Sequence, residues 1–302
     1  MKNDMIRELF QGWSLEPLKE GWSEDEKYLL RKSVTTKTLR ISRKKSLEDQ
    51  KKEYEAISSI PQVKGIIRPL SYGELEKGTT YILYTYEAGE DLRPILANMA
   101  EGIQYDLGLQ AGMKLSSIHS VQDTFSGSKG RAEAYSRKID LKIEKFYKHQ
   151  VQFPGLLEAV RYIDSHRSLL DGRPSVLLHG DYHVGNMVVE DHELKVLDFN
   201  RYSFGDPYEE FDRMTMNIHS SRTFSKGLLH AYFKGTPPMA FFALWKLYAL
   251  TNAVGSIPWA LENSPESLSF VKEMVANTLE EFLVDEVPVP RWYRAIEDTT
   301  HY

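Results

Sequence analysis

The chain has 302 residues, a formal net charge of −5 and no cysteine. This length suits two domains or one two-lobed unit, and a chain without cysteine forms neither a disulfide nor a Cys-based metal site. The mild acidity disfavours a nucleic-acid partner, which usually meets a basic face. The lack of cysteine fits a reducing compartment, and we expect a cytoplasmic protein.

Residues 1–88 have the pattern of short strands with one helix, and we expect them to form a small N-terminal lobe. Two β-rich segments, "EKYLLRKS" and "KTLRIS", flank a tight turn. The segment "SLEDQKKEYEAISSI" carries a partial helical stripe of apolar residues that Pro61 ends. Two more strands are predicted in "GIIRPLSYGELEKGTTYILYTY", and "EAGEDL" follows as a linker.

Residues 89–302 are mainly helical in pattern and predict a larger C-terminal lobe. We expect helices in the segments 105–119, 136–149, 155–170, 225–235, 239–255 and 267–283. The most apolar of these, 239–255, is too short to span a membrane comfortably and carries Lys246 at its middle. We therefore expect a buried helix, no membrane partner, and an α+β fold of two lobes.

The segment "LLHGDYHVGNMVVEDHELKVLDFN", residues 177–200, places a polar cluster between apolar runs. "MVV" and "LKVL" flank the polar turn "EDHE" and predict a β-hairpin. Asn186 then begins the first strand and Asp198 ends the second, so their side chains can converge at the open end. Asp181 lies in the loop just before Asn186. Two carboxylates and an amide around one point are oxygen ligands, which suit Mg²⁺.

A purely structural interpretation exists for each of these residues, because Asp and Asn often cap turns. Turn chemistry alone does not readily produce the joint pattern, which is a strand, H-G-D-x4-N, a hairpin and then L-D-F. His179 is expected to brace the loop. His183 is interpreted as a loop residue, since Mg²⁺ prefers oxygen ligands.

"HGDYHVGN" together with "VLDFN" resembles the catalytic loop and metal-binding segment of the aminoglycoside phosphotransferase family. These are small-molecule kinases with a protein-kinase-like fold. Weaker likenesses run along most of the chain, in "GWSEDEKYLL", "KTLRIS", "KKEYEAISSI", "YILYTYEAGEDL" and "GDPYEEFDRM". The resemblance implies a two-lobed protein-kinase-like fold, with a nucleotide-binding lobe at 1–88 and a catalytic, substrate-binding lobe at 89–302.

The resemblance also implies roles for the polar cluster. Asp181 would orient the attacking hydroxyl or accept its proton, while Asn186 and Asp198 would hold Mg²⁺ bridging the nucleotide phosphates. The nucleotide is ATP or GTP, between which these residues do not discriminate. Asp181, Asn186 and Asp198 are thus the expected catalytic residues, and the last two are the expected metal ligands.

In the first lobe, the resemblance places Arg40 where the family usually carries lysine, with Glu53 as its partner. Arginine can pair with phosphate bidentately. Lys37 is a rival on the same strand, although it falls on the opposite face from Arg40. Ser23, in the turn "EGWSED", could offer a backbone N–H group to phosphate.

The adenine ring would lie between the lobes. Its edge would meet the backbone of the hinge residues, and apolar side chains would cover its faces. The expected hinge residues are Thr85, Tyr86 and Glu87, and the candidate apolar cover is Leu39, Ile41, Leu83 and Leu197.

The acceptor is expected to be a small molecule with a hydroxyl group, because Pro207 and helix-like residues come within about ten positions of Asp198 and no A-P-E signature is present. An aminoglycoside or related antibiotic is the first hypothesis. It rests on the resemblance and on acidic residues of the second lobe, namely Asp206, Glu209, Glu210, Asp212, Glu262 and Glu266. A macrolide, a metabolic alcohol, a protein acceptor and a non-catalytic nucleotide-binding pseudokinase are the alternatives. The sequence leaves the oligomeric state open.

Overall fold

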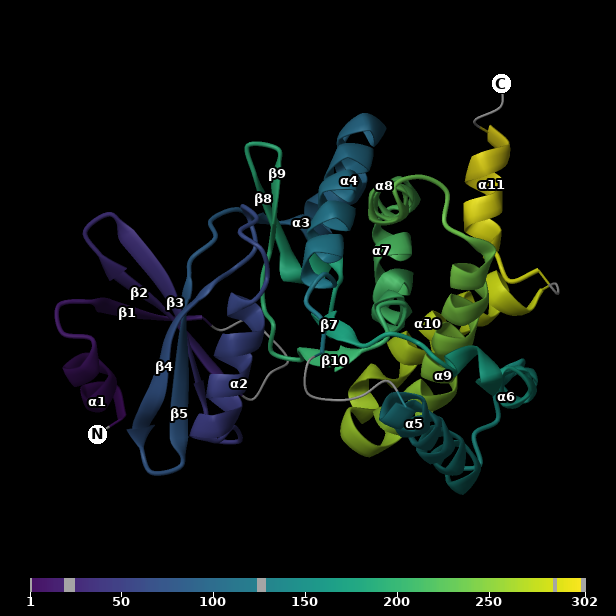
Figure 1. Ribbon diagram of the computed structural model, residues 1–302, viewed down its shortest axis with the longest axis horizontal. Coiled ribbons are helices and arrows are strands. Elements are labelled where there is room, and N and C mark those ends of the chain that lie inside the picture. Colours follow the sequence, from purple (N-terminus) through teal and green to yellow (C-terminus); the bar gives the residue numbers. More distant parts are fainter. Residues whose placement is uncertain (1, 19–24, 124–128, 285–286, 300–302) are drawn as a thin grey trace.

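The structure is a computed structural model that describes residues 2–18, 25–123, 129–284 and 287–299 (Figure 1). A β-rich N-terminal part lies beside a larger helical part, so the predicted α+β architecture of two lobes is confirmed. No helix among the described ranges is both long and apolar enough to cross a bilayer.

The N-terminal lobe is built on a five-stranded sheet with the order β1-β2-β3-β5-β4. Its strands are β1 (Ser14–Leu18), β2 (Glu26–Lys32), β3 (Thr35–Ser42), β4 (Pro69–Glu76) and β5 (Thr79–Thr85). All neighbours are antiparallel, and the two hairpins expected from the sequence are β2–β3 and β4–β5. Strand β1 and helix α1 (Lys2–Leu9) were not predicted.

One face of this sheet carries helix α2 (Leu47–Ser58), which begins at a capping box formed by Ser46 and Asp49. Arg40 reaches the buried α2 residue Glu53, so it points to the α2 side. Side chains alternate across a strand. The neighbouring residues Leu39 and Ile41 therefore lie on the other face, where they are buried with Ile6 of α1.

Leu83 faces Leu39 across the β3–β5 ladder and joins the same buried cluster. The expectation that Leu39, Ile41 and Leu83 cover the adenine is therefore wrong. Strand alternation directs them away from Arg40 and into the core beneath α1.

The C-terminal lobe contains the predicted helices, most of them within a few residues of the expected bounds. The described helices are α3 (Leu92–Ile95), α4 (Glu101–Ile118), α5 (Lys129–Lys148), α6 (Leu156–Ser165), α7 (Met214–Ser220), α8 (Arg222–Phe233), α9 (Met239–Asn263), α10 (Leu268–Leu283) and α11 (Arg291–Thr299). Helix α9 forms the centre of this lobe and is buried on most sides, as its apolar sequence predicts. Helices α3, α7 and α11 were not predicted.

Helices α4 and α8 approach very closely because glycines line their contact. A Cβ atom on Gly108 or Gly112 of α4 would collide with backbone atoms of α8, and one on Gly227 of α8 would collide with the backbone of α4. Helix α4 also supports the β8–β9 hairpin. The side chain of its Gln110 hydrogen-bonds to backbone groups of Leu194 and His192 in that hairpin.

Short strands connect the two lobes around the polar cluster. They are β6 (Glu90–Asp91), β7 (Val176–Leu178), β8 (Met187–Glu190), β9 (Glu193–Val196) and β10 (Ser203–Gly205). Strands β8 and β9 form the hairpin predicted from the sequence. The Val196 amide donates to the Gly65 carbonyl and the Ile67 amide donates to the Val196 carbonyl, which fixes this hairpin to the N-terminal lobe.

Candidate active site

The loop between β7 and β8 is held by a buried carboxylate, that of Glu210. Its oxygens accept hydrogen bonds from the His179 amide at 2.6 Å and the Gly180 amide at 2.9 Å. Gly180 has φ = +82°, and a Cβ atom there would collide with the Arg201 carbonyl. Only glycine fits this turn comfortably. Glu210 is buried and sets the path of the chain into Asp181.

The His179 ring joins the loop to the far end of the hairpin. Its Nε2 lies 2.7 Å from the Leu197 carbonyl, and its Nδ1 accepts the Asp181 amide at 3.3 Å. The carbonyl can only accept, so Nε2 carries the proton and Nδ1 is free to accept. This is the bracing role expected for His179.

Asp181 is surrounded by donors and cations. Asn186 Nδ2 lies 3.3 Å from Asp181 Oδ2. His183 Nε2, Arg213 Nε and Arg201 Nη1 lie 3.4, 3.6 and 3.9 Å from Asp181 Oδ1. Burial raises the pKa of Asp181, but the hydrogen bond from His183 and the charges of His183, Arg213 and Arg201 outweigh burial and lower this pKa below its ordinary value.

The open end of the hairpin brings Asn186 next to the segment carrying Asp198. The Leu197 amide donates to the Asn186 carbonyl at 2.9 Å, and Asn186 Nδ2 donates to the Asp181 carbonyl at 2.8 Å. The amide nitrogen of Asn186 is thus used within the loop, which leaves its oxygen as the atom suited to a metal. Asp198 adopts a left-handed backbone conformation with φ = +60°, which is uncommon for a residue other than glycine.

The donor set is compatible with Mg²⁺, because it consists of one carboxylate and one amide oxygen. In the described part of the chain no three His, Asp or Glu side chains form a group able to hold a metal. A metal at Asp198 and Asn186 would therefore depend on further oxygen ligands, such as water and phosphate, which is the usual mode for Mg²⁺.

Sequence reasoning missed Lys27, which contacts Asp198 directly. Lys27 Nζ lies 2.6 Å from Asp198 Oδ2 and joins strand β2 to the C-terminal lobe. Burial raises the pKa of Asp198, but the charge and hydrogen bond of Lys27 outweigh it and lower this pKa. The available signal was strand register: Lys27 pairs with Arg40 across the β2–β3 hairpin, so the two side chains share a face.

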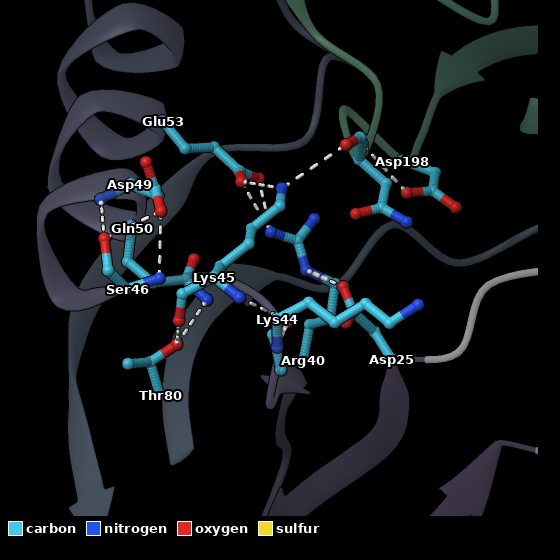
Figure 2. Close-up of polar contacts among 12 residues, drawn as sticks. Asp25, Arg40, Lys44, Lys45, Ser46, Asp49, Gln50, Glu53, Thr80 and Asp198 are labelled. Carbon is cyan, nitrogen blue, oxygen red and sulfur yellow. Dashed lines mark hydrogen bonds and ion pairs between the residues drawn. The ribbon is translucent and has the colours of Figure 1, made fainter. Parts of the chain in front are cut away.

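Arg40 and Glu53 form the predicted ion pair (Figure 2). Arg40 Nη2 lies 2.7 and 2.6 Å from the two carboxylate oxygens of Glu53. Lys45 Nζ contacts Glu53 at 2.7 Å, Tyr84 donates its hydroxyl to Glu53, and Arg40 Nε lies 3.3 Å from Asp25 Oδ2. Burial raises the pKa of Glu53, but Arg40 and Lys45 outweigh it and lower this pKa.

The other residues predicted to contact the nucleotide lie in the hinge, beside the hairpin and in the segment before β2. The Thr85 amide already donates to the Arg68 carbonyl at 2.8 Å, so this N–H group is not available to a nucleotide base, and Tyr86 and Glu87 remain candidate hinge contacts. Leu197 is partly buried and packs against the main core beside the hairpin. Ser23 lies outside the described residues.

A cavity of about 240 Å³ lies in the C-terminal lobe, near the candidate site but without its predicted residues. It is bounded by α5, β10 and the start of the "GDPYEEF" segment. Its polar lining residues include Lys138, Arg173, Asp206 and Glu209.

Comparison with known proteins places these features in context. Residues 14–242 match a family model described as the phosphotransferase enzyme family. No curated protein matches the sequence.

The fold is similar to that of several solved structures at low sequence identity. A thermostable mutant of aminoglycoside phosphotransferase APH(4)-Ia shares 13% identity and a TM-score of 0.65, with 91% of this chain and 97% of that chain covered. The APH(2'')-IIa complex with gentamicin shares 16% identity and a TM-score of 0.65, covering 91% and 95%. Spectinomycin phosphotransferase APH(9)-Ia, in complex with ADP and spectinomycin, shares 16% identity and a TM-score of 0.63, covering 91% and 98%.

Proposed function

Because the chain belongs to the phosphotransferase enzyme family, we propose that it transfers the γ-phosphoryl group of ATP or GTP to a hydroxyl group of a small molecule. The observation that carries the proposal is the meeting of Asp181, Asn186 and Asp198 at one end of the β8–β9 hairpin, beneath a cation from the first lobe. Such an assembly positions reactants and offsets charge, which is most of what phosphoryl transfer requires. Three of the similar structures contain ADP and another contains ATP, which supports an adenine nucleotide.

The proposed roles follow from the contacts. Asn186 and Asp198 would hold Mg²⁺, which would supply charge neutralisation for the nucleotide phosphates when bound. Asp181 accepts a hydrogen bond from the acceptor hydroxyl and directs its oxygen. A carboxylate with a lowered pKa is a weak base, so Asp181 acts mainly by positioning and takes the proton late in the transfer.

The nucleotide lies between the lobes in this proposal, with its base at Tyr86 and Glu87. We place the boundary between the lobes at residues 88 and 89, beside β6. A supply of ATP or GTP fits the expected cytoplasmic location.

The charges near Asp181 favour a neutral or anionic acceptor over a polycation. Arg201 and Arg213 stand beside Asp181, and each forms an ion pair with it. A polycationic acceptor would meet these guanidinium groups at the reacting hydroxyl, where like charges repel.

The acidic residues that suggested an aminoglycoside are mostly engaged within the protein. Arg173 binds Asp206 through two hydrogen bonds of 2.6 and 2.9 Å, and Lys138 pairs with Glu209. The other contacts are Glu210 with the amides of the catalytic loop, Asp212 with Arg213, Glu262 with Lys145 and His149, and Glu266 with Ser264. A polycation would have to displace several of these cations to bind.

The aromatic residues of this lobe offer little support for a macrolide, because most of them are core. The buried ones include Phe211, Phe241, Phe242, Trp245 and Tyr248.

The test is nucleotide consumption with a panel of acceptors of matched size and different charge. Cationic aminoglycosides, neutral polyols and hydroxy acids are incubated with MgATP or MgGTP, and phosphorylated product is identified by mass spectrometry. Product from a neutral or anionic alcohol alone supports the proposed acceptor class. Product from aminoglycosides alone contradicts that class and keeps the phosphotransferase. Single-turnover transfer to none of a broad panel, despite nucleotide binding, would favour a pseudokinase.

A further inference from the structure

The lysine that contacts the candidate metal-binding carboxylate comes from β2, one strand away from the predicted arginine. Lys27 and Arg40 are directly opposite each other in the β2–β3 ladder and project from the same face. Their side chains nevertheless have different partners. Lys27 crosses to Asp198 in the other lobe, whereas Arg40 remains within its own lobe.

We propose that Lys27 is the principal phosphate-binding cation of this chain, and that Arg40 is a structural residue that holds Glu53. This inference rests on the proposed function, because it assumes that a nucleotide binds at Asp198. It assigns to β2 the charge that the sequence led us to expect on β3.

Arg40 is poorly placed to bind phosphate because two carboxylates already engage it. Its Nη2 serves both oxygens of Glu53, and its Nε faces Asp25. The side chain is 3% exposed. To take the Nη2 donors a phosphate would have to replace Glu53, which is itself fully buried and held by Lys45 and Tyr84. Removing a partner from such a buried pair carries a large free-energy cost.

Lys27 differs from Arg40 in exposure and in the position of its charged end. Its side chain is 18% exposed, and that of Asp198 is 26% exposed, so a ligand can approach both. Phosphates held through a divalent cation at Asp198 would lie within reach of the Lys27 ammonium group. A lysine presents a point charge on a flexible chain, and it can therefore move from Asp198 to a phosphate oxygen without repacking the sheet.

The alternative is that Lys27 is only a structural bridge between the lobes. The two roles predict different effects of removing Lys27 on the binding of ligands with and without phosphate groups. Loss of the bridge would disturb every nucleoside that binds between the lobes, whether or not it carries phosphates. Loss of the phosphate contact would weaken MgATP and leave adenosine unaffected.

The experiment compares Lys27→Met with Lys37→Met. Lys37 lies on β3 and stacks 4.9 Å over the Trp13 ring, on the face away from Arg40. Its replacement removes the same charge from the opposite side of the same sheet. Dissociation constants for MgATP are measured by titration calorimetry, and those for adenosine by competition with a fluorescent nucleoside. Wild-type protein that failed to bind MgATP would refute the proposed function itself, separately from the role of Lys27.

We expect Lys27→Met to weaken MgATP binding about 10- to 100-fold, as for loss of a charge-assisted hydrogen bond. Adenosine affinity should stay within about twofold of wild type, and Lys37→Met should match wild type for both ligands. Unchanged or tighter MgATP binding by Lys27→Met would overturn the inference, as would equal loss of ATP and adenosine affinity. If Lys27→Met does not fold, Lys27→Gln is judged by the same criteria.

Discussion

Asp181, the carboxylate proposed to position the acceptor hydroxyl, lies among donors and cations that favour its ionised form. Its neighbours His183, Arg201 and Arg213 lower its pKa and fix its orientation. A carboxylate in this state contributes geometry more than basicity, since the driving force for early proton transfer is small. The position of Asp181 should therefore matter to the transfer step and little to nucleotide affinity.

We expect Asp181→Ala to fold, to bind MgATP with near wild-type affinity, and to transfer phosphate about 10² to 10⁴ times more slowly. The measurements are titration calorimetry and single-turnover transfer to the acceptor found in the panel. Asp191→Ala, in the exposed turn of the β8–β9 hairpin, is the matched control. Near-normal transfer by Asp181→Ala would refute the assignment.

Asp198 and Asn186 should differ in their effect on the metal–nucleotide complex. Asp198→Ala removes the charged ligand and should weaken MgATP binding strongly, whereas Asn186→Ala removes a neutral oxygen and should weaken it less. Calorimetric titration with MgATP and with metal-free ATP separates the two contributions. The assignment fails if Asp198→Ala retains wild-type affinity for MgATP.

At the scale of elements, α2 is attached to the sheet by charge as well as by apolar packing. Glu53 brings together Arg40, Lys45 and Tyr84 beneath the helix. We expect Glu53→Gln to lower the free energy of unfolding by about 3–5 kcal/mol, because it leaves Arg40 buried without its main counter-charge.

Urea unfolding checks this prediction, with Glu55→Gln as the control. Glu55 lies on the same helix but is exposed and makes only a long contact of 3.9 Å to Lys51. Its replacement should change stability by less than about 0.5 kcal/mol. Equal effects of the two substitutions on the free energy of unfolding would show that the buried cluster does not stabilise the protein more than an exposed ion pair does.

The same cluster gives stability a dependence on pH. The folded-state pKa of Glu53 is lowered, so its contribution is complete above the unfolded pKa of about 4.3 and is lost as pH falls through the folded pKa. The lowered pKa values of Asp181 and Asp198 act in the same direction. We expect stability from these groups to be flat from about pH 8 to 5 and to fall below about pH 4.

Urea unfolding at several pH values tests this, and Glu53→Gln should show a shallower acid decline than the wild-type protein. An equally steep decline in the variant would exclude Glu53 as a source of the pH dependence.

Local patterns in the sequence predicted most of the elements. The apolar run from Met239 to Gly255 and the stripe ending before Pro61 each became the expected helix, because burial and capping are encoded locally. Helix α1 and strand β1 were missed because both are short, with eight and five residues, and too few residues repeat to give a clear period. Helix α7 was missed because its seven residues are too few to show a period.

The candidate site was predicted where residues are close in sequence, as in the segment from His179 to Asp198. It was mispredicted where strand register decides. Lys27 requires the β2–β3 pairing, and Leu39 requires knowledge of which face α1 covers. Neither pairing nor coverage is visible in a single strand, because every strand offers two faces.

At the scale of the whole molecule, side chains at the candidate nucleotide site help to join the lobes. Lys27 bridges to Asp198, and Lys45 contacts Glu53 in its own lobe and the Asn200 carbonyl in the other. The backbone contacts of Val196 with Gly65 and Ile67 form a separate connection behind the hairpin. A ligand at Asp198 would therefore change the side-chain contacts between the lobes and leave the backbone hydrogen bonds of Val196 in place.

We expect MgATP to stabilise the whole chain against unfolding by linkage. At a free concentration of about 100 times its dissociation constant, it should raise the free energy of unfolding by about 2.7 kcal/mol. Asp181→Ala should retain this stabilisation, because the proposed role of its side chain is to contact the acceptor and not the nucleotide. Asp198→Ala should lose most of it at the same ligand concentration. Thermal unfolding with and without MgATP measures both, and equal stabilisation of the two variants would place the nucleotide somewhere other than Asp198.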